Sequence, residues 1–341
     1  MDVDTRTRWA IVLVLACMSV VAAQQPPVFR TNTDLVLVPV SVTDRTGRVV
    51  GGLKADHFEL SDSGVRRAVT QFSAGRVPIS LAILLDVSGS MMQGPDARAA
   101  DDARWRDTRR ALEMLLARLG TDDDVLFAVF NDRVAASPWT QDHGRILEAF
   151  DALRPNGDTA LLQAVGQIAP VFRIARHQRK VLLLISDGNE TQVPAGAVVA
   201  PPQHEIGDLT AQFGESDRTR RQLSIAAARD AIRKSDATLY AIGIGTRAGL
   251  PVNTALLEDL TKEAGGYAEP LRNPSEILAA VARICDDLRS QYILAFEPAH
   301  ADGKYHLIRV RTRGTDLKVR ARAGYVAPSI ESRNPTGPNR Y

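Results

Sequence analysis

The sequence predicts an α/β fold in which a doubly wound, mainly parallel sheet is inserted into a small all-β sandwich formed by both chain ends. Two apolar runs, at residues 79–85 and 181–185, are typical of strands buried on both faces of a parallel sheet. From residue 79 to about 290, strand patterns alternate with helical patterns, which indicates helices on both faces of that sheet. The two ends of the chain show strand patterns alone.

The first residues are similar to an export signal. Arg6 and Arg8 precede an apolar run at residues 9–21, which is too short to span a bilayer comfortably. Small residues then suit cleavage after Ala23. We therefore expect an exported protein, either periplasmic or secreted.

Two membrane-attached forms are alternatives. Asp2 and Asp4 weaken the positive charge ahead of the apolar run, which leaves an uncleaved anchor open, and residues 13–17 loosely resemble a bacterial lipobox that would place a lipid on Cys17. The other cysteine, Cys285, falls in an amphipathic segment, and we expect it to be a small apolar core residue.

The segment before the first parallel strand predicts short strands and no helix of normal length. Strands are expected at residues 35–42, 58–60 and 68–72, with turns at 44–47 and 62–64. Because isolated hairpins are marginally stable, we expect these strands to pack with those at the other end of the chain.

The central part carries the alternating pattern. Its helices show apolar residues at helical spacing, and its strands are short apolar runs. After the first strand we expect a helix at 103–119, strands at 125–131 and 134–139, helices at 145–153 and 159–176, a strand at 181–185, a helix at 223–235, a strand at 239–244, a helix at 253–264, a short strand near Tyr267 and a helix at 274–288.

Strand patterns return after the last helix. Strands are expected at residues 292–297, 305–311 and 317–323, and the Pro- and Asn-containing tail predicts disorder. The chain thus divides into a signal peptide (1–23), an N-terminal β segment (24–77), the α/β domain (78–290), a C-terminal β segment that pairs with the N-terminal one (291–327) and a disordered tail (328–341).

The composition excludes some partners. The chain has 341 residues, of which 45% are hydrophobic and 24% charged, so it is long enough for one large domain and a smaller one. Its formal net charge of +2 is nearly balanced. We therefore expect no nucleic-acid partner and no electrostatic attraction to a membrane.

Polar side chains follow the first buried strand where it ends. The loop Asp86-Val87-Ser88-Gly89-Ser90 gathers a carboxylate and two hydroxyls, and parallel sheets bind ligands beyond the carboxyl ends of their strands. A hard cation such as Mg²⁺ needs more oxygen ligands than one loop offers. Thr159, at the start of a predicted helix, and Asp187, after the second buried strand, supply further oxygens.

Each of these residues taken singly also suits a structural role. Asp, Ser and Gly are common in turns, and Thr159 suits the cap of its helix. The combination of three loops in this order is what favours a metal site.

The three pieces, Asp-x-Ser-x-Ser, Gly-x-Thr-x-Leu and Ser-Asp-Gly, resemble the metal-ion-dependent adhesion site of von Willebrand factor A domains. The resemblance implies that Ser88 and Ser90 ligate the metal directly, and that Asp86, Thr159 and Asp187 do so directly or through water. A sixth position would stay open for a Glu or Asp carboxylate of a protein partner. Mg²⁺ is the expected ion, with Mn²⁺ and Ca²⁺ as alternatives.

The layout of residues 28–327 carries a second resemblance. The sequences at 35–40, 84–91, 302–305 and 324–325 are similar to those of secreted von Willebrand factor A-related proteins of Acidobacteria. The family also suggests that metal occupancy is coupled to movement of the last helix.

One departure from the family is the long segment at residues 189–220. A loop of this length is usually functional or disordered, so it is a candidate selectivity rim beside Asp187 or a disordered segment.

Other polar clusters are expected to be structural. The run at residues 122–124 predicts a polar loop, and the arginines of the helix at 103–119 are expected to face solvent. The six histidines lack the spacing of zinc ligands. A solvated acidic helix face is expected from Asp96, Asp101, Asp102 and Asp107.

The motifs favour binding over catalysis. Ser88 lies in no Gly-x-Ser-x-Gly elbow, and no P-loop or dinucleotide fingerprint occurs. We expect an exported, metal-dependent, adhesion-type protein that recognises an acidic group of a partner, and not an enzyme. The alternative is a structural or assembly subunit of a bacterial envelope complex, in which the metal only stabilises the loops.

Overall fold

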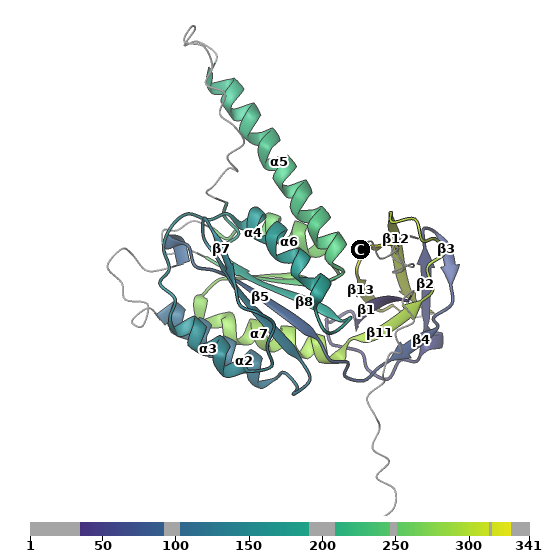
Figure 1. The fold of residues 1–341 in the computed structure, drawn as a ribbon. Helices are drawn as coiled ribbons and strands as arrows, with labels where there is room; N and C mark the ends of the chain where they lie inside the picture. The colour runs from purple at the N-terminus through teal and green to yellow at the C-terminus, as the bar shows by residue number, and fades with distance from the viewer. Residues whose placement is uncertain (1–34, 92–102, 191–208, 246–250, 314–315, 329–341) are drawn as a thin grey trace, which may run out of the picture. The chain divides into compact units, whose positions relative to one another are not determined.

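The computed structural model describes residues 35–91, 103–190, 209–245, 251–313 and 316–328 (Figure 1). Within this part of the chain, no helix is both long enough and apolar enough to cross a membrane. Several expectations fall outside the described residues: the signal peptide, the lipid site at Cys17, the acidic residues Asp96, Asp101 and Asp102, residues 191–208 of the loop expected at 189–220, and the tail from residue 329. The end of that expected loop is wrong, because a helix begins at Leu209 and not near residue 223.

A six-stranded, mainly parallel sheet forms the centre of the α/β part, as predicted. Its strands are β5 (Ser80–Asp86), β6 (Asp124–Phe130), β7 (Val134–Ala136), β8 (Lys180–Ser186), β9 (Thr238–Ile244) and β10 (Ala268–Leu271). They lie in the order β10-β9-β8-β5-β6-β7, and only β7, at one edge, is antiparallel to its neighbour. Every residue of β5 is buried, which explains the apolar run between Ser80 and Asp86.

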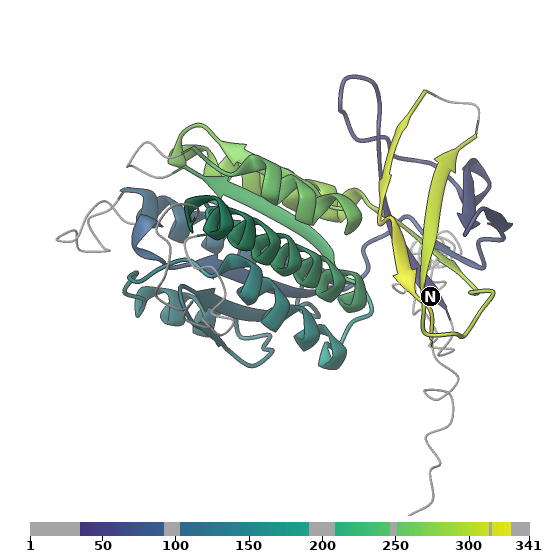
Figure 2. The same cartoon turned by 90° about the horizontal axis from the view of Figure 1, so that it is seen from above.

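Helices cover both faces of this sheet (Figures 1 and 2). Side chains of β5 alternate between the two hydrophobic cores: Leu81, Ile83 and Leu85 belong to one, Ala82 and Leu84 to the other. The first core is completed by α2 (Ala103–Ala117), α3 (His143–Asp151) and α7 (Ile277–Ser290), the second by α4 (Leu161–Ile168), α5 (Leu209–Ser235) and α6 (Thr254–Glu263). Cys285 of α7 is a buried residue of the first core, as expected.

The helix expected at residues 159–176 is shorter. It divides into α4 and a 3-10 segment, η4 (Ala169–Ile174). Pro170 lies at the start of η4, and proline cannot donate the backbone hydrogen bond that would continue an α-helix. The helix also begins two residues after Thr159, so this threonine belongs to the preceding loop.

Both ends of the chain form a sandwich of two antiparallel sheets, which confirms the predicted fold class. One sheet has the order β13-β1-β11-β4 and the other β14-β12-β2-β3. Each sheet contains strands from both chain ends. The strands are β1 (Val36–Thr43), β2 (Phe58–Asp62), β3 (Val65–Arg67), β4 (Gln71–Ser73), β11 (Tyr292–Phe296), β12 (Tyr305–Thr312), β13 (Lys318–Ala321) and β14 (Gly324–Val326).

Two expected strands are shorter than predicted, and beside each lies a short strand that was not predicted. The strand expected at residues 68–72 begins only at Gln71, as β4, which pairs with β11, whereas the unpredicted β3 precedes it and pairs with β2. The strand expected at 317–323 ends at Ala321, as β13, which pairs with β1, whereas the unpredicted β14 follows it and pairs with β12. Local alternation does not show which neighbour a strand will find.

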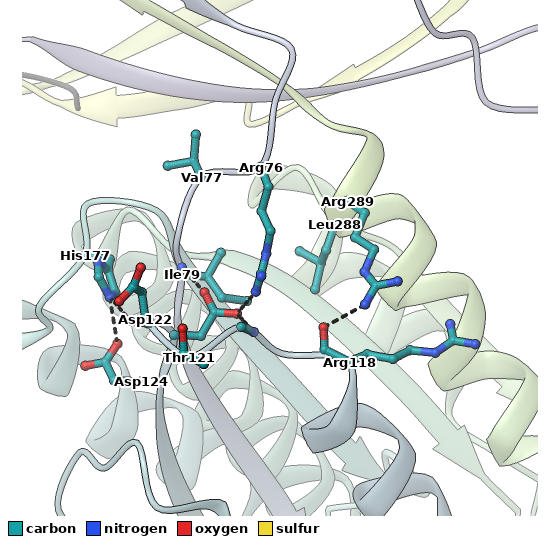
Figure 3. Close-up of polar contacts among 12 residues, drawn as sticks. Arg76, Val77, Ile79, Arg118, Thr121, Asp122, Asp124, His177, Leu288 and Arg289 are labelled. Carbon is teal, nitrogen blue, oxygen red and sulfur yellow. Dashed lines mark hydrogen bonds and ion pairs between the residues drawn. The ribbon is translucent and has the colours of Figure 1, made fainter. Parts of the chain in front are cut away.

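A solvated polar loop was predicted at residues 122–124. Asp122 is exposed as predicted, but Asp123 and Asp124 are buried, so the prediction is wrong for these two residues. Asp123 is 2% exposed, accepts a hydrogen bond from the Ile79 amide at 2.9 Å and pairs with Arg76. In Figure 3, Arg76 and Ile79 lie on the segment that enters β5, beside this loop. Asp124 begins β6 and is also buried. The carboxylates therefore tie together the starts of two neighbouring strands.

Buried polar side chains join the end of α7 to the sandwich. Asp287 of α7 accepts hydrogen bonds from the Tyr240 hydroxyl of β9 and from the Arg320 guanidinium of β13, both at 2.6 Å. Gln291, just after α7, donates to the same tyrosine oxygen at 2.9 Å and to Ser41 of β1 at 3.2 Å. This junction network thus connects the parallel sheet, the last helix and the sandwich.

Candidate metal centre

The site lies where two central strands of the parallel sheet end. β5 and β8 are adjacent and parallel, so Asp86 and Ser186, their last residues, lie at the same edge. The chain runs outward from β5 in both directions of the sheet, which makes this edge the switch point where open α/β sheets bind ligands.

Four of the five predicted site residues lie within one chain of polar contacts. Asp86 is fully buried and accepts hydrogen bonds from the Ser88 amide at 2.9 Å and from the Ser186 hydroxyl at 2.7 Å. The Ser88 and Ser90 hydroxyl oxygens are 3.1 Å apart, and Ser90 donates to the Asp187 carboxylate at 2.9 Å. The first and third loops therefore meet through their functional side chains.

Thr159, the fifth predicted residue, lies on a second loop held against the first. The Gly89 amide donates to the Gly157 carbonyl at 3.0 Å, which brings the two loops together. Thr159 itself is 1% exposed. The N-cap position of α4 is Ala160, so capping this helix does not account for the buried threonine.

Two glycines shape the loops that carry Thr159 and Asp187. Gly157 and Gly188 have φ angles of 81° and 74°, which side chains with a Cβ rarely adopt. A Cβ on Gly188 would also lie 3.0 Å from the Asn253 carbonyl oxygen. The glycines of the sequence motifs are thus required by backbone geometry beside the site.

Burial makes the charged form of the Asp86 carboxyl unfavourable, and a nearby cation would offset this effect. Removal from water raises the pKa of its carboxyl to about 6; hydrogen bonds from Ser88 and Ser186 oppose this, and the nearby charge of Asp187 adds to it. A cation between the two carboxylates would lower that pKa and favour the charged form.

The donor set fits a hard divalent cation. Carboxylate and hydroxyl oxygens are the ligands that Mg²⁺, Mn²⁺ and Ca²⁺ prefer. In the described part of the chain, no group of three or more His, Cys, Asp and Glu side chains is placed to hold a metal. Any metal here would therefore depend on the hydroxyls of Ser88, Ser90 and Thr159.

Arg104 was expected to face solvent, and this is wrong. The side chain lies in the first turn of α2, is 5% exposed, and donates to the Ser90 carbonyl at 3.4 Å. Arg106 and Arg110 of the same helix are exposed, as expected. Helical spacing shows which residues face the sheet, but it does not show that the first turn lies beside the metal loop.

Glu190 was not among the predicted site residues. Its carboxylate accepts a hydrogen bond from the Leu162 amide at 2.8 Å, in the first turn of α4. Ala160, the N-cap residue of this helix, makes no side-chain cap hydrogen bond. Glu190 therefore links the loop of Asp187 to the helix that follows Thr159, and its place three residues after Asp187 was the only signal in the sequence.

We expect Glu190→Ala to weaken this link. Loss of a carboxylate at a helix N-terminus costs about 1 kcal/mol, and misplacement of the second loop should reduce metal affinity by about threefold. Mg²⁺ titration followed by thermal unfolding measures both effects. Glu190→Gln keeps an acceptor oxygen and should retain most of the affinity; equal behaviour of Glu190→Ala and the wild type would contradict the bracing role.

The part of the chain that holds all five site residues matches a known family model. Residues 81–190 match the model described as von Willebrand factor type A domain. No protein with a curated description matches this sequence. The family match runs from β5 to the loop after β8.

Solved structures with a similar arrangement share little sequence with this chain. BatB, a conserved hypothetical protein from Bacteroides thetaiotaomicron, is 17% identical, with a TM-score of 0.42, over 62% of this chain and 97% of its own. The vWF domain of the type V pili tip protein Mfa5 from Porphyromonas gingivalis is 15% identical, with a TM-score of 0.45, over 62% and 94%. A von Willebrand factor type A protein from Catenulispora acidiphila is 12% identical, with a TM-score of 0.45, over 90% and 76%.

Proposed function

We propose that this chain is an exported binding protein that recognises an acidic group of a protein partner through a divalent cation. The observation that carries the proposal is the contact chain from Ser88 through Ser90 to Asp187, next to the buried carboxylate of Asp86. The match of residues 81–190 to the von Willebrand factor type A model supports it.

The site residues would hold the ion and would also leave it electron-poor. Ser88 and Ser90 would ligate it through neutral hydroxyls, while Thr159, Asp86 and Asp187 would complete the shell directly or through water. A bound divalent cation, Mg²⁺ in the first place and Mn²⁺ or Ca²⁺ as alternatives, supplies an electron-poor centre with one position for a partner's oxygen. Because few carboxylates would lie in its direct shell, it would attract a Glu or Asp side chain.

A contact of this kind is stronger than an exposed ion pair. Charge-assisted bonds in a partly dry site contribute a few kcal/mol, whereas exposed pairs contribute about 0–1 kcal/mol. The role is binding and not catalysis. The export signal at residues 1–23 would place the site outside the cytoplasm.

The experiment is affinity capture from the envelope fraction of the native organism, with Mg²⁺ or with EDTA. We expect a partner that is retained with Mg²⁺, released by EDTA, and lost with Ser90→Ala. Ser137→Ala, a change of the same type away from the site, should capture it normally. Partners that stay bound in EDTA would favour the alternative, in which the chain is an assembly subunit and the metal only stabilises the loops.

A further inference from the structure

A second site lies at the other end of the parallel sheet. A cavity of about 280 Å³ is lined by residues at the starts of β8 and β9 and by strands of the sandwich. Lys180 begins β8 and lines the cavity, whereas Ser186 ends β8 at the metal loops. At 3.3 Å per residue, the two ends of this strand are about 20 Å apart. The cavity is thus separate from the candidate metal centre.

Cationic groups form one wall of the cavity. Arg179, Lys180 and Arg322 line it, and Asp236 is the one anionic side chain among the lining residues. Arg322 is 9% exposed and pairs with Asp236 through one terminal nitrogen, while its Nε is buried without a hydrogen-bond partner among the described residues. The same holds for Nε of Arg179, which is 5% exposed. The terminal nitrogens of Arg179 bond to Val77, Leu288 and Gln291, so in each of the two arginines Nε is the donor left without an acceptor in the part of the chain that the structure describes.

Lys180 adds a charge that Asp236 compensates only in part. The residue is half-buried, and within the described part of the chain its ammonium forms no hydrogen bond or ion pair. Burial lowers the pKa of this ammonium, and the charge of Asp236 acts against that. An anion in the cavity would supply the missing partner.

The opposite wall is apolar, which explains an anomaly in the sequence. A sandwich strand usually alternates apolar and polar residues, but residues 35–40, at the start of β1, are apolar on both faces. Val38 and Val40 belong to the sandwich core, Leu35, Leu37 and Pro39 line the cavity, and Val36 does both. The apolar residues on the second face therefore surround a space.

We propose that this cavity binds a small organic acid, with its carboxylate at Lys180 and Arg322 and its apolar body against Leu37 and Ile293. The volume is about twice the 150 Å³ of a cavity that holds benzene, so a ligand of about a dozen non-hydrogen atoms fits. Charged donors select the acid, and the apolar wall selects against short, hydrophilic anions.

The test uses octanoate, octan-1-ol and acetate as probes with the full chain, measured by calorimetric titration. We expect octanoate to bind saturably at one site, at least tenfold more tightly than octanol or acetate. Lys180→Met keeps the length of the side chain but removes the charge, and it should weaken octanoate binding at least tenfold. Lys234→Met, on the exposed end of α5, is the matched control and should bind octanoate normally.

A second variant keeps the test decisive if Lys180→Met unfolds. Leu37→Trp fills the cavity without removing the charges, and it should abolish octanoate binding while the thermal transition is retained. Asp86→Ala should bind octanoate like the wild type, which separates this site from the metal centre. Equal affinity of the wild type and a folded Lys180→Met would overturn the proposal. So would binding that appears only after residues 329–341 are removed, since that segment would then be the natural occupant.

Discussion

Asp86→Asn is expected to abolish the stabilisation of this protein by Mg²⁺ and, in metal-free protein at pH 7, to raise its stability. The wild type should gain about 2.7 kcal/mol of unfolding free energy when Mg²⁺ reaches 100 times its dissociation constant. The variant should gain nothing, because it lacks a buried carboxylate to balance the cation. Thermal unfolding with and without Mg²⁺ measures both differences.

The gain in metal-free protein follows from the pKa of Asp86. Burial raises it from 3.8 to about 6, so the folded protein binds this proton more tightly than the unfolded chain does. The charged carboxylate therefore reduces stability above pH 6, by about 3 kcal/mol in the limit. The neutral asparagine does not carry this cost.

The dependence of stability on pH shows whether the charged Asp86 carboxylate destabilises the metal-free protein. As the pH falls from 7 through 6 to about 4, the metal-free wild type takes up the proton and recovers the lost stability. The advantage of Asp86→Asn should therefore shrink toward zero over this range. Asp158→Asn, an exposed residue beside Thr159, is the control and should keep the Mg²⁺ response. A Mg²⁺ response that survives in Asp86→Asn would contradict the metal site.

Asp287→Ala is expected to destabilise the protein by about 3–5 kcal/mol, the usual cost of removing one partner from a buried ion pair. The carboxylate is 8% exposed and accepts hydrogen bonds from Tyr240 and Arg320. Without it, the Arg320 guanidinium, which also stacks over the Tyr267 ring, loses its counter-charge. Thermal unfolding should show a fall of roughly 10 °C.

The neighbouring Asp286→Ala is the matched control. This carboxylate is on the same helix, but 68% of its side chain is exposed and its partner, Arg118, lies 3.3 Å away at the surface. An exposed pair of this kind contributes at most about 1 kcal/mol. If the two alanine variants unfolded at the same temperature, the junction network would have no special part in stability.

The fold class could be predicted because its signals are local. Burial of β5 and β8 on both faces imposes long apolar runs, and the alternation with helices implies the parallel sheet. The places where the chain leaves one sheet for the other, between β3 and β4 and between β13 and β14, carry no such signal. Strand pairing is a choice between distant partners, so local alternation does not determine it.

The residues missed at the candidate site share the same cause. Arg104 and Glu190 are ordinary surface residue types, and each acts through a backbone group of another segment. The same holds for Asp123, at the opposite end of the sheet, which is buried and accepts a hydrogen bond from the Ile79 amide just before β5. Each role depends on which segments meet, which the spacing of residues along the chain does not show.

The sequence by itself determined the parallel sheet, the sandwich and the three loops that carry Asp86, Thr159 and Asp187, since burial and turn geometry leave patterns within a few residues. Tertiary structure alone decided the junction network around Asp287 and the cavity at Lys180. Both features lie between segments more than 30 residues apart, among them Asp287 with Arg320, and both owe their energetics to burial. The interactions of a charged side chain become strong only when folding removes it from water, because the dielectric constant around it then falls.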